Sequence, residues 1–352
     1  MRPSSCPSWL LVLAAASAGC GSDPVPSPER EPAAPTLPAP AAGEGFQIDE
    51  GSFSVESGRE ALFCQRYPVP ASYGDAPFFL RGVESLLPEG THHFFMSYEE
   101  GALDAPQACA GDDPLLEVDD PAVAAENHDA VDGKLAFTAA VGDDAYWLPE
   151  GYGIFFESGR GHFTTSHHIL NLTADTADLY GVFNVYTAPA AQVPHPVNIF
   201  NCLLRDVDVP PHETVSLSAT CTVPFDLDMV VLSSHAHQYL SRFEMRVFDG
   251  EQTQPEVIYE SSQWDSPAIV PLEQPLHLVK GQGLTFTCQY ANPSDEPITY
   301  GAGELKEMCA VMSAYAYPPD RTGEVPPSLG GVVFTEGGKT LLIDTTDIGG
   351  NF

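Results

Sequence analysis

The chain has 352 residues and a formal net charge of −35 at pH 7, because 49 acidic residues face only 14 Lys and Arg. With so few basic residues it cannot form the basic patch that nucleic-acid binding requires, so nucleic acid is excluded as a partner. The charge also repels anionic ligands and membranes at long range, and it favours solubility and the attraction of cations.

The first twenty residues are typical of a bacterial lipoprotein signal peptide. Arg2 precedes an apolar stretch over residues 9–16, which is too short to span a membrane and ends in Ser17-Ala18-Gly19-Cys20. This ending is similar to a lipobox, in which Cys20 becomes the lipidated first residue; an ordinary signal peptide with a spare cysteine is the alternative. Gly21, by resemblance to known lipoprotein sorting, favours the outer membrane. We therefore expect a periplasmic or surface protein held by a lipid anchor.

Residues 21–44 are rich in Pro, Ala, Ser and Glu and contain almost no large apolar side chain. Such a stretch cannot bury enough surface to fold, and it predicts a disordered tether. About three hundred residues remain, enough for two domains. Because the segment from Thr187 to Pro196 has no periodicity, we place the boundary there and predict domains over 45–190 and 191–352.

The rest of the chain alternates short apolar runs with clusters of Gly, Pro, Asp and Asn. Strand-length runs occur at residues 61–64, 93–96, 152–156, 181–186, 229–232, 243–248 and 284–288. This pattern predicts an all-β fold, with two jelly-roll-like antiparallel β-sandwich domains in tandem. Neither a long helical periodicity nor an internal repeat is evident.

Cys6 and Cys20 lie in the expected signal peptide, which leaves six cysteines for the exported body. An even number in an exported protein predicts three disulfides, and six cysteines allow fifteen pairings. Proximity in the sequence favours the pairs Cys64–Cys109, Cys202–Cys221 and Cys288–Cys309. The last pair would tie the strand that carries Met308 to a neighbouring strand.

The segment His235-Ala236-His237 lies in a strand-like run and indicates a metal site. On a β-strand, residues i and i+2 point to the same face, so the two imidazoles can converge on one ion. Met308 follows some seventy residues later, within Glu307-Met308-Cys309. Its thioether is a poor ligand for zinc, magnesium or calcium and a good one for Cu(I). The set His235, His237 and Met308 therefore predicts a copper site.

A second set of histidines indicates a second metal site. His92 and His93 are adjacent, so on a strand they diverge and can share an ion only with a local bend and a further ligand. His167 or His168 could supply that ligand. Most histidines of a β protein are surface or hydrogen-bonded residues, and five have no motif around them and receive no role: His128, His162, His195, His212 and His277.

Together these motifs resemble the copper type II, ascorbate-dependent monooxygenases, which include peptidylglycine hydroxylases and dopamine β-hydroxylases. The order in that family is His-His, a single His, His-x-His, and Met within Asp-Glu-Met-Cys. The corresponding segments here are Thr91-His92-His93, His168-Ile169-Leu170-Asn171, Ser234-His235-Ala236-His237 and Lys306-Glu307-Met308-Cys309. The resemblance covers residues 64–317, and the His-x-x-Asn spacing favours His168 over His167.

The resemblance implies two copper ions per chain. His92, His93 and His168 would hold an electron-transfer copper, whereas His235, His237 and Met308 would hold the catalytic copper where O2 binds. The implied reaction hydroxylates a C–H bond of a small organic substrate, with ascorbate or an equivalent as the reductant. In the family the two sites face each other across a cleft between the two domains.

Four positions depart from the family pattern. Peptidylglycine hydroxylases grip the substrate carboxylate with an arginine at the position of Ser233. They also carry a tyrosine at the position of Met312 and a glutamine at that of Ser166. Lys306 replaces the aspartate of Asp-Glu-Met-Cys. The missing grip and the acidic charge argue against peptide amidation and favour a neutral or cationic substrate.

Two other classes of function remain open at the level of the sequence. A non-catalytic periplasmic lipoprotein that binds or transfers copper would use the same Met and His ligands. The presence of two chemically distinct ligand sets favours the enzyme, because a carrier does not need both. In a third class the fold is kept and the histidines have structural or carbohydrate-binding roles.

Overall fold

The computed structural model describes residues 36–87, 91–109, 115–117, 134–139, 143–171, 173–264, 267–301, 305–336 and 339–342. The expected signal peptide, Cys20 and the first part of the expected tether lie outside the described residues. Residues 36–352 form one compact unit. In the part of the chain that the structure describes, no helical segment has the length and hydropathy of a membrane span.

A twelve-stranded sheet runs through the described part of this unit. Its main path is β1 (Gly45–Val55), β11 (Ala177–Ala188), β3 (Phe78–Leu86), β9 (Tyr152–Phe156), β12 (His195–Leu204), β23 (Cys309–Ala316), β15 (Leu227–Leu232) and β19 (Val270–Leu278). Four further strands pair beside this path: β8 (Asp143–Trp147), β16 (Ser234–Ala236), β24 (Leu329–Glu336) and β25 (Lys339–Leu342).

Three smaller sheets complete the described fold. One contains β5 (Gln107–Ala108), β2 (Glu60–Pro68), β10 (Gly161–Leu170), β4 (Thr91–Glu100), β7 (Lys134–Ala139) and β6 (Leu115–Glu117). Another contains β14 (Thr214–Thr222), β20 (Gly283–Ala291), β17 (Leu240–Phe248) and β18 (Thr253–Ser261). The third contains β13 (Asp208–Val209), β21 (Ile298–Tyr300) and β22 (Lys306–Glu307). Short 3₁₀ turns occupy Ala71–Tyr73, Ala190–Gln192 and Pro319–Arg321.

The all-β class predicted from the sequence is confirmed, and each apolar run named above falls in a strand. Burial explains the pattern of these runs. In β10, Phe163, Thr165, His167 and Ile169 alternate as buried positions on one face. In β15 every residue is buried, because the strand lies between β23 and β19 with both faces covered.

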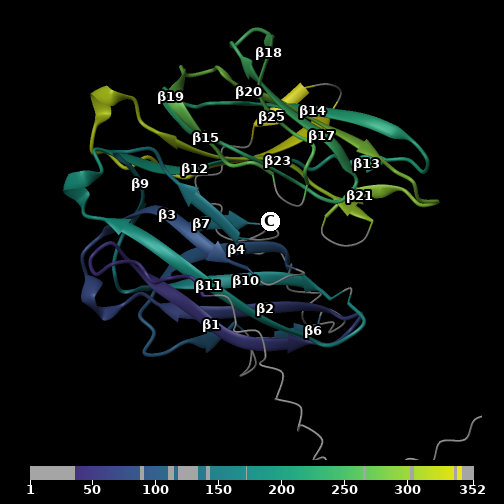
Figure 1. The fold of residues 1–352 in the computed structure, drawn as a ribbon. Helices are drawn as coiled ribbons and strands as arrows, with labels where there is room; N and C mark the ends of the chain where they lie inside the picture. The colour runs from purple at the N-terminus through teal and green to yellow at the C-terminus, as the bar shows by residue number, and fades with distance from the viewer. Residues whose placement is uncertain are drawn as a thin grey trace, which may run out of the picture. The chain divides into compact units, whose positions relative to one another are not determined.

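Two large apolar cores lie between the sheets. One contains side chains from β1, β3, β4, β9, β10 and β11, among others, and includes Phe94, Phe163 and Phe183. The other is made of side chains from β12, β14, β15, β17, β20 and β23, and includes Phe243 and Phe286. Each core is thus closed by the twelve-stranded sheet on one side and a smaller sheet on the other, as in a β-sandwich (Figure 1).

The twelve-stranded sheet is continuous across the predicted boundary at Thr187 to Pro196. Strand β12 pairs in parallel with β9 through His195, Pro196 and Val197, and pairs antiparallel with β23 along its length. Val230 and Val231 of β15 also pack into the core of the first sandwich. The two sandwiches therefore share backbone hydrogen bonds and buried side chains. The domain boundary itself stays a prediction.

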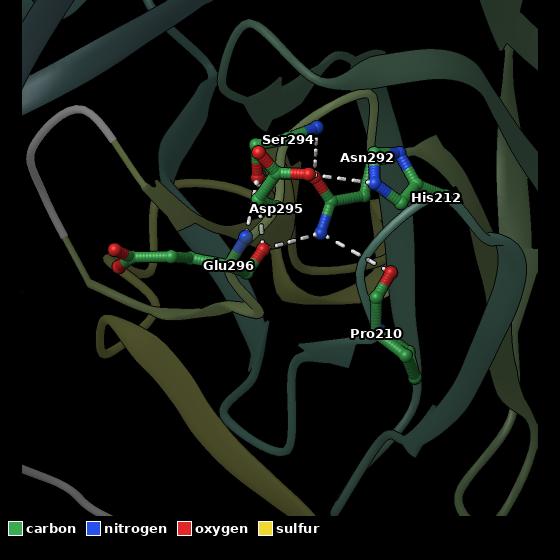
Figure 2. Close-up of polar contacts among 6 residues, drawn as sticks. All are labelled: Pro210, His212, Asn292, Ser294, Asp295 and Glu296. Atoms are coloured by element: carbon green, nitrogen blue, oxygen red, sulfur yellow. Dashed lines mark hydrogen bonds and ion pairs between the residues drawn. The ribbon is translucent and has the colours of Figure 1, made fainter.

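An asparagine at the end of β20 fastens the second sandwich (Figure 2). The amide of Asn292 donates to the carbonyl oxygens of Val209 at 2.9 Å, Pro210 at 3.1 Å and Glu296 at 2.8 Å. Its Oδ1 accepts from the N–H of Ser294 at 2.9 Å and from the hydroxyl of Ser294 at 2.7 Å. One buried side chain thus makes five hydrogen bonds, which connect the turn at Ser294 and Glu296 to the end of β13.

Asn171 makes the equivalent contacts at the end of β10. Its amide donates to the carbonyl oxygens of Val55 at 2.8 Å and Asp175 at 3.0 Å, and its Oδ1 accepts from the N–H and hydroxyl of Thr173. The asparagine of the His-x-x-Asn spacing is therefore a structural residue. The repeated arrangement shows that the two sandwiches close one edge in the same way.

The last part of the expected tether contacts the first sandwich. The carbonyl oxygen of Leu37 accepts a hydrogen bond of 2.8 Å from the side chain of Gln47, and that of Pro38 accepts one of 2.8 Å from Asn184. These contacts begin before Gly45, where we expected the folded domain to start.

Candidate copper centre

The antiparallel pairing of β16 with β23 places His235, His237 and Met308 on one face. His235 lies opposite Ala310, and Ala236 lies opposite Cys309. Ala236 and Cys309 are buried in the core of the second sandwich, whereas Met308 and Ala310 pack on the other side of the strand with Leu203. Because directly paired residues share a face, His235 lies on the face of Met308. His237, two residues further along, belongs to that face too.

The two imidazoles lie close together. Their ring centroids are 5.1 Å apart, with an interplanar angle of 87°. Nδ1 of His237 lies 3.3 Å from the carbonyl oxygen of Lys306. A carbonyl oxygen only accepts, so Nδ1 carries the proton and Nε2 carries the lone pair that can bind a metal. His237 is buried, and His235 is half-buried.

Glu307 holds the two ligand-bearing segments together. Its buried carboxylate accepts backbone N–H groups from His237 at 2.8 Å, Tyr239 at 2.6 Å and Met308 at 3.3 Å. Burial raises the pKa of the Glu307 carboxyl to about 7, against the lowering effect of these donors. No role was predicted for Glu307 from the sequence; the signal that could have found it is a carboxylate directly before the apolar run of residues 308–312.

Two more contacts fix the backbone around Met308. The hydroxyl of Tyr290 donates to the carbonyl oxygen of Met308 at 2.7 Å. Nζ of Lys306 donates to Oγ1 of Thr299 at 2.7 Å, so the lysine that replaces the family's aspartate binds a neighbouring strand. The backbone of Met308 is thus held by Tyr290 at its carbonyl oxygen, and the chain before it is held by Lys306.

The second predicted ligand set comes from two neighbouring strands of the six-stranded sheet. His92 and His93 lie in β4, His168 lies in β10, and the register places His168 opposite His93. Directly opposite Cα atoms of an antiparallel pair are about 4.5–5.5 Å apart. The backbone therefore brings the three positions together; their side chains lie outside the described part of the structure.

His167 has a different environment. Its Nε2 lies 2.8 Å from Oε2 of Glu50, and both side chains are fully buried. The ring of Phe94 packs against it with a centroid distance of 4.5 Å. The contact with Glu50 occupies His167 inside the first core and favours His168, at the alternate position of the strand, as the ligand.

The other histidines of the described chain have partners of their own. Nδ1 of His162 lies 2.9 Å from the carbonyl oxygen of Gly101, and His195 stacks on Tyr152. His212 and His277 pair with Asp295 at 2.9 Å and Asp228 at 2.7 Å, respectively. His128 lies outside the described residues.

The donor chemistry of the face of His235, His237 and Met308 fits copper. Within the described chain, no group of three or more His, Cys, Asp or Glu side chains gathers as a metal site. The set formed by β16 and β23 instead combines two imidazoles with a thioether, a combination suited to Cu(I). The first sandwich approaches this face, because the ring of Phe95 in β4 has its centroid 6.4 Å from that of His235.

The three predicted disulfides are present. Cys64–Cys109, Cys202–Cys221 and Cys288–Cys309 have Cα–Cα distances of 5.4, 6.5 and 6.1 Å. The third bond joins β20 to the first residue of β23, next to Met308. It therefore anchors the strand end that carries the thioether.

A comparison with protein-family models matches residues 198–324 to one family, described as "Copper type II ascorbate-dependent monooxygenase, C-terminal domain". The predicted resemblance is confirmed over this segment. The match covers just over a third of the chain and contains His235, His237 and Met308. It supports copper- and ascorbate-dependent monooxygenase chemistry for the second sandwich.

A comparison with curated protein sequences finds no match. Among solved structures, the STIV MCP aligns at a TM-score of 0.35 and 8% identity, covering 79% of this chain and 98% of that one. The major capsid protein P2 from bacteriophage PM2 aligns at 0.31 and 6% identity, covering 76% and 98%. PNGF-II aligns at 0.21 and 10% identity, covering 80% and 63%. Likenesses at such low TM-scores carry no argument about this chain.

Proposed function

We propose that this protein is a copper-dependent monooxygenase that hydroxylates a C–H bond of a small organic substrate, with O2 and an ascorbate-like reductant. The observation that carries the proposal is the shared face of His235, His237 and Met308, within the segment that matches the monooxygenase family. Copper bound there supplies the one-electron and O2 chemistry that no side chain provides. The overall reaction places one oxygen atom in the substrate and the other in water, using two electrons and two protons.

The protein's own groups have distinct tasks in this proposal. His235 and His237 bind the ion, and Met308 favours its reduced form because a thioether is a soft ligand. Glu307 fixes the spacing between His237 and Met308 through three backbone N–H groups. His92, His93 and His168 would bind a second copper and pass electrons toward the first.

The first experiment measures copper stoichiometry together with ascorbate-dependent O2 uptake in the full chain. We expect two coppers per chain and copper-dependent O2 uptake. Met308→Leu keeps the side-chain volume but removes the sulfur, so it should lose one reduced copper and the uptake. Met229→Leu makes the same change at a buried core position and should lose neither.

The outcomes separate the candidate functions. Two coppers without O2 uptake under any reductant would favour the non-catalytic copper-binding lipoprotein. Absence of bound copper would favour a fold whose histidines have other roles. Full copper-dependent oxidation by Met308→Leu would contradict the assignment of Met308 as a ligand.

The electron-transfer role belongs to the first ligand set and has its own test. His168→Ala should lower copper stoichiometry by one and slow turnover, while the ion bound by His235, His237 and Met308 is retained. His167→Ala is the neighbouring control: it should destabilise the first sandwich through loss of the Glu50 contact and keep both ions in the folded fraction.

We also propose that the mature protein is held on the outer membrane through lipid on Cys20. The proposal is supported by the apolar stretch and small residues before Cys20 and by the Pro- and Ala-rich segment after it. Cys20→Ser should release the protein into the soluble fraction and abolish incorporation of labelled fatty acid. Continued membrane fractionation of Cys20→Ser would contradict it.

A further inference from the structure

A cavity of about 60 Å³ lies between the two sandwiches of the compact unit. Tyr146 and Ile154 line it from β8 and β9 of the first sandwich, and Ile199 lines it from β12. From the second sandwich, Ser233 and Met312 face it. Both halves of the chain are therefore needed to form the cavity.

The cavity adjoins the candidate copper centre. Met312 packs against the apolar cluster that contains Ala310, two residues before it in β23, and Met308, four residues before it. The N–H of Met312 donates to the carbonyl oxygen of Ser233 at 3.0 Å, and Ser233 precedes His235 by two residues. A molecule in the cavity would thus lie beside the face that carries His235, His237 and Met308.

None of the described residues that line the cavity is charged. The wall is apolar apart from the phenol of Tyr146 and the hydroxyls of Ser233 and Ser313. A carboxylate or ammonium group placed against this wall would lose hydration without gaining an ion partner. An uncharged alkyl group would instead gain free energy on transfer from water.

The volume suits a small group. A single water needs about 10–15 Å³ on the same scale, and a cavity of about 150 Å³ holds benzene. A cavity of about 60 Å³ lies between these values and matches a branched alkyl group of three or four carbons.

We infer that this cavity binds an uncharged, branched alkyl end of the substrate and presents the adjoining carbon to the copper centre. The inference rests on the proposed function and names its substrate class. Selection follows from what the wall lacks, since neither a cationic nor an anionic end finds a partner there. Ser233 and Met312 are the residues that determine this specificity.

The test compares three probes of one shape and different charge: isobutyramide, isobutyrate and isobutylammonium. Binding to the full chain is followed without copper through the ¹³C-methyl NMR signal of Met312, assigned by its loss in Met312→Leu. We expect isobutyramide to shift this signal saturably and to bind at least tenfold more tightly than either ion. Equal or tighter binding of an ion, or no shift of the Met312 methyl, would overturn the inference.

Ser233→Arg provides a reversal. A guanidinium in the wall supplies the missing anion partner, so isobutyrate should become the preferred probe. Ser216→Arg, at an exposed position of β14, adds the same charge outside the cavity and should leave the preference unchanged. If Ser233→Arg does not fold, the comparison of probes in the unchanged protein still decides the matter.

The binding test is independent of the copper measurements. If the protein binds no copper or takes up no O2 but still prefers isobutyramide to both ions, the cavity is a binding site for neutral ligands in a protein that is not a monooxygenase. Copper-dependent O2 uptake without selectivity would leave the enzyme and remove this assignment of its substrate.

Discussion

Glu307 is a buried carboxylate whose partners are backbone N–H groups of the two segments that carry His237 and Met308. A carboxylate can accept several hydrogen bonds at once, and hydrogen bonds to a charged acceptor are stronger than neutral ones. Pairing between β16 and β23 stops at Ala236, and beyond that point the Glu307 side chain binds the backbone N–H groups in its place. The ligand geometry depends on a residue that binds no metal itself.

Glu307→Gln should weaken both the fold and the site. One amide oxygen can still accept, but the NH2 group faces a backbone N–H, which costs about 1–3 kcal/mol of unfolding free energy. Cu(I) affinity should fall about tenfold or more, as for residues that orient ligands. Urea unfolding and a Cu(I) competition titration measure the two effects. Glu260→Gln, an exposed control, should change neither, and unaltered Cu(I) affinity in Glu307→Gln would show that the carboxylate does not position the ligands.

His167 and Glu50 show a second use of buried polar groups. Glu50 reaches His167 across Gly181, where a Cβ atom would collide with its carboxylate. The hydroxyl of Thr165 also donates to Glu50. The contact with Glu50 thus engages His167, the residue next to the predicted ligand His168, so that His167 does not compete for the metal.

At the scale of the strand, the bond Cys288–Cys309 connects the end of the site to the core. It closes a loop over a sequence separation of 21 residues. Loops of this length constrain the unfolded chain by about 3 kcal/mol. The same bond fixes the first residue of β23 against β20, beside Met308.

Replacing both Cys288 and Cys309 by alanine should lower the unfolding free energy by about 2–4 kcal/mol and weaken Cu(I) binding. The double replacement of Cys64 and Cys109 by alanine is the matched control: it should also lower the unfolding free energy and leave Cu(I) binding at Met308 unchanged. Urea unfolding and Cu(I) titration of both variants make the comparison. Equal Cu(I) affinities in the two variants would contradict a local role for Cys288–Cys309.

The turn between β17 and β18 depends on a charged acceptor. Oδ1 of Asp249 accepts the N–H groups of Glu251 and Gln252, each at 2.9 Å. The Gln252 and Glu251 N–H groups lower the pKa of Asp249 below its ordinary value. Because the folded state favours the ionised form, the resulting stability is present above the unfolded pKa and is lost as pH falls through the folded pKa.

Asp249→Asn keeps an oxygen acceptor without the charge, so it should lower the melting temperature slightly at pH 7. The difference from the unchanged protein should shrink as the pH falls below about 4, the ordinary range of an Asp side chain. Thermal unfolding at several pH values measures it. A difference that stays constant to pH 3 would mean that the charge of Asp249 does not contribute.

At the scale of the whole molecule, local patterns predicted more than long-range ones. The all-β class follows from runs such as 243–248, whose alternation is visible in the sequence. The disulfides follow from proximity, and the shared face of His235 and His237 follows from the two-residue period of a strand. None of these inferences requires knowledge of which strands become neighbours in the fold.

Contacts that depend on which strands become neighbours could not be predicted. Glu50 and His167 meet because β1 and β10 line one core from different sheets. Glu307 meets Tyr239 because β16 pairs with β23. The Asn171 and Asn292 arrangements share only a short pattern of polar residues, too brief to reveal a repeat. The cavity at Met312 likewise needs strands from both sandwiches.

The continuous sheet leads to a prediction about cooperativity. Strand β12 bonds to β9 on one side and β23 on the other, and Val230 and Val231 of the second half pack in the first core. Separation of the sandwiches would expose these side chains and break these hydrogen bonds. We therefore expect both halves to unfold together, in one transition.

Two tryptophans report on the halves separately: Trp147 lies in β8 of the first, and Trp264 packs against the core of the second. In a Trp9→Phe background, single-tryptophan variants should show coincident urea transitions. Phe183→Leu, in the first core, should lower stability by about 1–2 kcal/mol and shift both transitions equally. Val279→Ala, at an exposed position of the second half, should move neither by more than about 0.5 kcal/mol. A shift of the Trp147 transition alone would show that the sandwiches unfold independently, and the cavity between them would then open without global unfolding.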